Sequence, residues 1–263
     1  MFLPTRADEP LPPDIVIELA SILQLDDGAF IVGGQALNLW AELYSDDCPE
    51  LADFGPFTSK DLDYFGQQAA ASKLASALDG EVIFPDPDDA TPNAALVTAV
   101  IGDRKIQIDF MRHVMGVRPT PLKQLATELL VPLDNGGVLA IPLMHPLHCL
   151  QSRIANVLKL DRSDQTAMRQ LGAAPHVLEA YLLRMLDLNE VKEVQDTLRN
   201  LYHYLLSDPE GKKAASLPMK DPLEIISRLT KHQKLDWRYR WFNLRAMRRK
   251  IASKRTIREL RAT

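Results

Sequence analysis

The pattern of hydrophobic residues changes once along the chain, near residue 142, and this change constrains the fold more than any other feature. Before it, short apolar runs of strand length alternate with stretches of helical spacing. After it, every periodic stretch has helical spacing and no strand signal returns. Strands and helices followed by helices alone are typical of an α+β protein. We therefore expect two domains, residues 1–142 with a sheet and residues 143–263 entirely helical.

Two turn signals predict how strands of the first domain are connected. The dipeptide Gly102-Asp103 separates two runs that are rich in β-branched residues, and Asn135-Gly136 separates another two. Dipeptides of this kind supply the positive φ angles of tight turns. We therefore expect a β-hairpin at each of these places.

Two aspartates, Asp61 and Asp63, stand in the run KDLDYF at residues 60–65, which otherwise has the composition of a buried strand. Residues two apart on a strand point to one face, so the two carboxylates lie together while Leu62 and Tyr64 face the core. Two carboxylates so close repel each other, and a cation between them removes this cost. Hard oxygen ligands of this kind suit Mg²⁺ or Mn²⁺.

The predicted strand at residues 105–110 supplies a third carboxylate, Asp109, on the face opposite its alternating Ile and Phe side chains. If this strand lies near the first, the three carboxylates can hold two metal ions about 3.5–4 Å apart. Such a pair of ions supports in-line phosphoryl and nucleotidyl transfer. Asp61, Asp63 and Asp109 are therefore the candidate catalytic and metal-binding residues.

The apolar run at residues 29–32 ends at Gly33 and Gly34, where helical spacing begins. A backbone without Cβ atoms can approach a ligand closely, and a helix N-terminus presents free N–H groups to a phosphate. The spacing matches neither the Rossmann nor the P-loop motif. Taken alone, the glycine pair fits a tight turn without a ligand equally well.

The order strand, Gly-Gly, helix, strand with D-x-D, and later strand with a single Asp resembles the DNA polymerase β-type nucleotidyltransferase superfamily. Within it, VGGQALNLWAE and TSKDLDYF are most similar to the AbiEii-type group, which includes bacterial toxin and abortive-infection nucleotidyltransferases. The resemblance covers residues 14–115 and implies a nucleotidyltransferase fold, a mixed sheet flanked by helices. It implies that Gly33 and Gly34 cradle the triphosphate. It also implies that Asp61 and Asp63 bind metal, with Asp109 as base or metal ligand.

Three further residues are candidates for nucleotide binding, and one segment departs from the family pattern. Gln35 stands where many members have Ser or Thr, but an amide can donate the same hydrogen bond. Lys60 is either a phosphate contact or a solvated lysine at the edge of the strand. Arg153, on a helix after the sheet, is either a cation for the triphosphate or a surface arginine paired with an acid. Residues 45–57 form a loop or insertion that lengthens the spacing from the glycines to the aspartates.

Charge is unevenly spread along the chain. From Lys234 to the end, eleven Lys and Arg residues face two acidic ones, a net charge of +9, so the remainder carries −13. Helical spacing of Trp237, Trp241 and Leu244 predicts that the aromatic rings pack inward and that the arginines form an exposed face. That face suits an RNA backbone, although a solvated helix that offsets the acidic body is the ordinary alternative.

These features predict a Mg²⁺-dependent (or Mn²⁺-dependent) nucleotidyltransferase that moves a nucleoside monophosphate from an NTP to an RNA, tRNA-like, or protein hydroxyl acceptor. The resemblance adds a toxin-like or phage-defence role, with a cognate antitoxin protein as a partner. The alternative is an inactive nucleotide- or RNA-binding module, or a regulatory partner protein. Two cysteines and the lack of an apolar run of eighteen residues predict a cytoplasmic protein without a membrane span.

Overall fold

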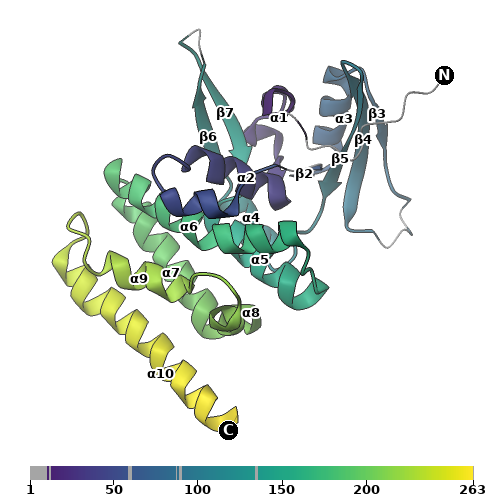
Figure 1. Cartoon of the computed structure of the whole chain (residues 1–263). Coiled ribbons are helices and arrows are strands. Elements are labelled where there is room, and N and C mark those ends of the chain that lie inside the picture. The colour runs from purple at the N-terminus through teal and green to yellow at the C-terminus, as the bar shows by residue number, and fades with distance from the viewer. Residues whose placement is uncertain are drawn as a thin grey trace. The chain divides into compact units, whose positions relative to one another are not determined.

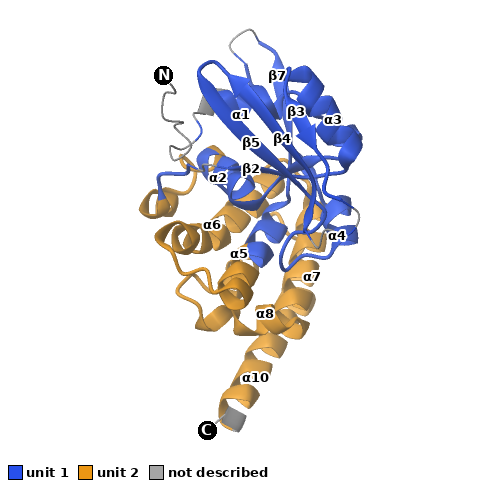
Figure 2. Cartoon of the chain, turned by 90° about the vertical axis from the view of Figure 1, so that its right-hand side faces the viewer, with its two compact units in different colours: residues 1–42, 55–152 blue, residues 43–54, 153–263 orange. Residues whose placement is uncertain are grey.

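The computed structural model describes residues 11, 13–58, 61–86, 88, 91–133 and 136–262, and shows an α+β protein (Figure 1). The chain divides into two compact units. The first comprises residues 1–42 and 55–152, and the second comprises residues 43–54 and 153–263 (Figure 2). The domain boundary expected at residue 142 stays a prediction.

In its described residues, the first unit contains a mixed sheet of seven strands in the order β3-β4-β5-β2-β1-β7-β6. Neighbouring strands are antiparallel except for two parallel pairs, β2 with β5 and β1 with β7. The strand bounds are β1 Phe30–Val32, β2 Leu62–Phe65, β3 Glu81–Ile83, β4 Asn93–Ile101, β5 Arg104–Met111, β6 Thr127–Pro132 and β7 Val138–Leu143.

Both predicted hairpins are confirmed. β4 and β5 pair from Ile101 and Arg104 onward, and Gly102 between them has a φ of 62°. β6 and β7 form the second hairpin, in which Gly136 has a φ of 79°. These positive φ angles explain why glycine occupies both turns. Asn135 lies outside the described residues.

Helices and a stacked aromatic pair build the core of the first unit. The helices are α1 Pro13–Ala20, α2 Gly33–Leu43, α3 Gln68–Ala77, α4 Pro119–Gln124 and the start of α5 Pro146–Leu160, which belongs to the second unit from residue 153 onward. α4 follows β5, and α5 follows β7. Leu62 and Tyr64 are fully buried, as the alternation on their strand predicts. The Tyr64 ring stacks on Phe110 of β5 at 5.3 Å, and its hydroxyl donates to the Leu19 carbonyl at 3.3 Å. This packing fixes the opposite face of β2, which carries Asp63.

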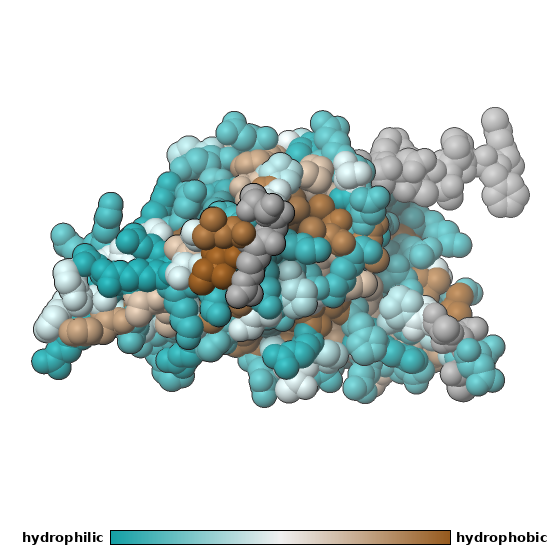
Figure 3. Space-filling model, turned by 90° about the horizontal axis from the view of Figure 1, so that it is seen from below, coloured by the Kyte–Doolittle hydropathy of each residue, from teal (hydrophilic) through white to brown (hydrophobic). Residues whose placement is uncertain are grey.

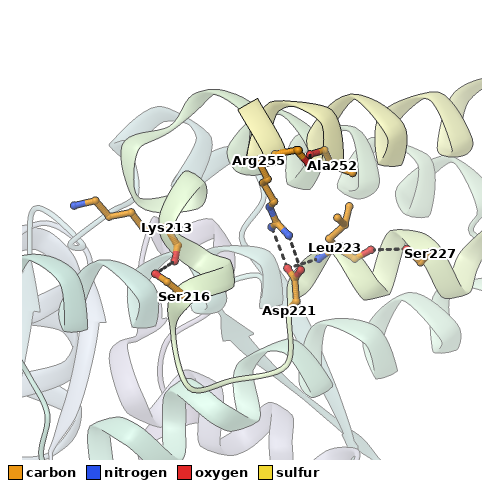
Figure 4. Close-up of polar contacts among 8 residues, drawn as sticks. Lys213, Ser216, Asp221, Leu223, Ser227, Ala252 and Arg255 are labelled. Atoms are coloured by element: carbon orange, nitrogen blue, oxygen red, sulfur yellow. Dashed lines mark hydrogen bonds and ion pairs between the residues drawn. The ribbon is translucent and has the colours of Figure 1, made fainter. Parts of the chain in front are cut away.

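The second unit is helical, and the described part of residues 153–262 contains no strand. Its main elements are the 3₁₀ segment Pro49–Phe54, α6 Gln165–Asp187, α7 Val191–Ser207, α8 Pro209–Lys213, α9 Pro222–Leu229, the π-helical turn Tyr239–Leu244 and α10 Arg245–Ala262. Asp221 caps α9 by accepting the Leu223 N–H at 3.0 Å. The same carboxylate binds both terminal nitrogens of Arg255 on α10 (Figure 4). One side chain therefore both starts α9 and attaches α10 to it.

The prediction that the C-terminal aromatic rings pack inward is wrong. Trp237 and Trp241 are 57% and 54% exposed, whereas Leu244 is fully buried. The π-helical turn at residues 239–244 explains the difference, because it contains more residues per turn than an α-helix and rotates the preceding residues off the buried face. Tyr239, five residues before Leu244, turns inward instead, and its hydroxyl donates to the Gln195 carbonyl at 3.3 Å.

Among the described residues, no helix has both the length and the apolar character that crossing a bilayer requires. The face of the molecule drawn in Figure 3 is mostly hydrophilic, with hydrophobic residues in separate groups.

Candidate active site

Asp63 and Asp109 lie opposite each other on neighbouring strands in the middle of the sheet. β2 and β5 run parallel, and their register pairs Asp63 with Asp109. Neighbouring strands are about 4.8 Å apart, so side chains on the same face of such a pair are in reach of one another. On its other side β2 pairs with β1, where Asp63 is opposite Val32. The expected proximity of the two aspartate-bearing strands is therefore confirmed.

Asp61 is exposed and stands directly before β2. Burial raises the pKa of Asp109 above its usual range, and the negative charge of Asp61 adds to this rise. The negative charges of the three carboxylates repel one another, and a bound cation would reduce this repulsion.

Asn93, the first residue of β4, orients the third carboxylate. Its side-chain amide donates to Asp109 Oδ1 at 3.0 Å. Asn93 is not among the site residues predicted from the sequence. A regular hairpin register pairs Leu96 with Asp109, and only the shift in register between Asn93 and Ala95 brings the amide to that position. Because a β-bulge has no clear mark in the sequence here, no local signal could have identified Asn93.

Gly33 joins β1 to α2 directly against Asp63. Its φ is 72°, and a Cβ atom built on it would lie 2.7 Å from Asp63 Oδ2. Both facts favour glycine at this position. The helix that starts here has eleven residues, so its N-terminal N–H groups and positive dipole end lie beside a carboxylate of the triad. Gly34 is the next residue of the same helical turn and is partly exposed.

Gln35 lies in the first turn of α2 and is only 6% exposed. Its Oε1 atom has no hydrogen-bond partner among the described residues. A buried amide oxygen without a donor costs free energy, and such groups are rare away from sites that receive a ligand or water. The expected contact between Gln35 and a phosphate stays a prediction.

The position of the remaining two predicted nucleotide ligands at this place is not tested. Lys60 lies outside the described residues. Arg153 belongs to the second unit, where it is 8% exposed and its Nη1 donates to Gln170 Oε1 on α6 at 2.7 Å. Arg153 is therefore buried, and the surface position that the alternative assumed is wrong. Arg153 and Asn156, three residues apart on α5, line one small cavity, and the role of Arg153 toward a nucleotide stays a prediction.

Another cluster that the sequence analysis missed lies within the second unit. Cys48, Glu50 and His176 each place one potential ligand atom within 4.8 Å of the others. Cys48 and Glu50 fall in the segment predicted to be a loop or insertion, and His176 follows 126 residues after Glu50. Metal-binding motifs are identified in a sequence by short spacings between ligands, so these three residues form no identifiable motif.

The first unit thus offers two chemical features at one place: three carboxylates able to hold divalent cations, and a glycine-led helix N-terminus suited to an anion. Comparisons of the chain with protein-family models, with curated proteins and with solved structures each found no match.

Proposed function

We propose that this protein is a nucleotidyltransferase of the DNA polymerase β type that uses Mg²⁺ or Mn²⁺ and a nucleoside triphosphate. The observation that supports this most is the position of Asp63. It lies opposite Asp109 on a parallel strand and against the Cβ-free face of Gly33. The carboxylates suit cations, and the N–H groups at the start of α2 suit the negatively charged triphosphate. Both kinds of group lie beside the turn from β1 to α2.

Each residue of this site has a proposed role. Asp61 and Asp63 hold the cations, which neutralise the triphosphate and lower the pKa of the attacking hydroxyl when bound. The N–H groups at the start of α2 bind phosphate oxygens, and the missing side chain at Gly33 leaves the approach open. Asn93 holds Asp109 in one orientation. Asp109 accepts the proton of the hydroxyl, and burial that raises its pKa makes it a better base.

The proposed reaction conserves all atoms of the two substrates. The acceptor hydroxyl oxygen forms a bond to the α-phosphorus of the NTP. The bond between that phosphorus and the oxygen bridging to the β-phosphate breaks. Pyrophosphate leaves with the electron pair, and the nucleoside monophosphate remains on the acceptor. The described residues do not identify the base, so ATP, CTP, GTP and UTP are all candidate donors.

We favour RNA over a protein hydroxyl as acceptor because of the start of the basic C-terminal segment. Trp237, Trp241 and Phe242 are all more than half exposed. The guanidinium of Arg245 lies 3.6 Å from the centroid of the Trp241 ring, and that of Arg238 lies 5.5 Å from Trp237. Exposed aromatic rings among arginines suit unstacked bases and phosphates of single-stranded RNA. A toxin-like or phage-defence role and a cognate antitoxin partner remain further proposals.

A transfer assay tests this function. Purified protein is incubated with each α-³²P-labelled NTP, Mg²⁺, and either total RNA or protein extract. We expect a labelled acceptor with wild type and none with Asp63→Asn, which keeps the shape of the side chain but removes its charge. Asp103→Asn, at the exposed hairpin turn, is the matched control and retains transfer. NTP binding without transfer to any acceptor would instead support the inactive nucleotide-binding module.

A further inference from the structure

The segment at residues 43–54 is held firmly on α6 within the second unit. Leu51 is fully buried, and Gly172 of α6 accommodates the ring of Phe54. A Cβ atom at Gly172 would lie 2.3 Å from Phe54 Cε1, so a larger residue would displace the ring. Phe54 also packs against the His176 ring, with the centroids 5.6 Å apart. These contacts fix the distance between the segment and one face of α6.

This packing brings together three side chains with different donor atoms. The ligand atoms of Cys48, Glu50 and His176 all lie within 4.8 Å of one another. Cys48 Sγ is 3.5 Å from Glu50 Oε2. In a tetrahedral zinc site with bonds of about 2.0–2.3 Å, neighbouring ligand atoms are roughly 3.3–3.8 Å apart. The three side chains therefore need to move by only about 1 Å to surround one ion.

The three residues also line a common cavity of about 450 Å³ in the second unit. A fourth ligand, such as a water molecule or a small anion, therefore has room beside them. The nearby cations Lys220 and Arg228 both form ion pairs with Glu179 on the cavity wall. Their charge is thus partly balanced, which limits their repulsion of a metal ion.

A thiol beside an imidazole and a carboxylate also suggests a nucleophilic cysteine. A reactive cysteine needs a depressed pKa, since only the thiolate attacks. Here burial, followed by the hydrogen bond to Glu50, raises the pKa of Cys48 to about 11. The cluster is therefore a poor nucleophile, whereas a bound metal ion displaces the thiol proton directly.

We propose that Cys48, Glu50 and His176 bind one transition-metal ion, with Zn²⁺ the cation that best fits this mixture of sulfur, oxygen and nitrogen donors. The ion ties residues 43–54 to α6 and leaves a coordination position open to the cavity. This site is separate from the carboxylates proposed for Mg²⁺, whose oxygen-only donors suit harder cations. The inference does not depend on the proposed nucleotidyl transfer.

Cobalt substitution tests this site without any measurement of activity. The full chain is treated with a chelator and titrated with Co²⁺, which gives a near-ultraviolet charge-transfer band only when a thiolate is bound. We expect this band in wild type, in Cys149→Ala, which removes the other cysteine, and in Asp63→Asn. We expect no band in Cys48→Ser.

Two ligand variants guard against a folding defect in the cysteine variant. Glu50 is exposed, so Glu50→Gln leaves the packing intact. Mutation of a residue that only hydrogen-bonds a metal ligand lowers metal affinity by about 10–100-fold. Because Glu50→Gln and His176→Gln each change a ligand itself, both should weaken Zn²⁺ binding by more than about 100-fold. The proposal is overturned if wild type shows no thiolate band. It is also overturned if the band persists in Cys48→Ser, or if both ligand variants bind Zn²⁺ as tightly as wild type.

Discussion

Comparison of Gly33→Ala with Gly28→Ala separates the cost of a left-handed backbone from the effect of the contact with Asp63. Gly33 and Gly28 have nearly the same left-handed φ, 72° and 69°. A left-handed conformation costs an alanine about 1–2 kcal/mol, and this cost is shared by both variants. Around Gly28 nothing lies within 4 Å of an added Cβ atom, whereas at Gly33 the Cβ lies 2.7 Å from Asp63 Oδ2. Gly28→Ala is therefore a matched control.

The contact with Asp63 should make the two variants differ. We expect Gly28→Ala to lower the free energy of unfolding by about 1–2 kcal/mol. Gly33→Ala should lower it by roughly 1 kcal/mol more, the lower end of the cost of overpacking, because the partly exposed Asp63 side chain can rotate away. That rotation moves a proposed ligand, so Mn²⁺ affinity should fall at least about tenfold in Gly33→Ala and stay unchanged in Gly28→Ala.

Urea denaturation gives the two free energies, and calorimetric titration with Mn²⁺ gives the two affinities. If both variants lose the same stability and bind Mn²⁺ equally well, the contact between Gly33 and Asp63 does not position a metal ligand.

Three other predictions concern the charge of Asp109, the exposed aromatic surface and the attachment of α10. Burial and the charge of Asp61 raise the pKa of Asp109 in the folded protein above its value in the unfolded chain. The folded protein therefore loses stability as the pH rises from the lower to the higher of these two pKa values. Asp109→Asn should therefore gain more in melting temperature over wild type at pH 7 than at pH 3, in the presence of EDTA, and equal gains would contradict this. Trp241→Ala should weaken single-stranded RNA binding in fluorescence anisotropy by about 5–150-fold, the value of one stacked base, with little loss of stability. Leu260→Ala, at a 72% exposed aliphatic residue, is its control, and equal effects would refute stacking. Asp221→Ala should lower the free energy of unfolding in urea by about 1–3 kcal/mol, against less than about 1 kcal/mol for Asp196→Ala, whose ion pairs are on the surface. A smaller loss of unfolding free energy in Asp221→Ala would show that the cap of α9 and the ion pair with α10 do not stabilise the two helices.

Local signals predicted the parts of the fold that depend on neighbouring residues. The hairpin at Gly102 needs only a turn dipeptide between two strands, and the sequence contains both. The burial of Leu62 and Tyr64 opposite Asp63 follows from the two-residue period of a strand. The pairing of Asp63 with Asp109 required one tertiary assumption, that the two strands are neighbours, and the register of β2 and β5 confirms it.

The features that the sequence did not predict all depend on irregular geometry or on distant residues. A shift in register brings Asn93 to Asp109, and a π-helical turn rotates Trp241 out of the buried face. The segment at residues 43–54 has no periodic pattern, yet it packs on α6 because Gly172 makes room for Phe54. Such fits become visible only when side chains far apart in the chain meet.

Counting the metal ions at the three aspartates tests the central proposal most directly. Electron paramagnetic resonance measures the Mn²⁺ bound per chain in the presence of a non-hydrolysable NTP analogue. We predict about two tightly bound ions in wild type, and a loss of this binding in Asp63→Asn but not in Asp103→Asn. Equal Mn²⁺ binding by wild type and Asp63→Asn would contradict the proposal that these carboxylates hold the catalytic cations.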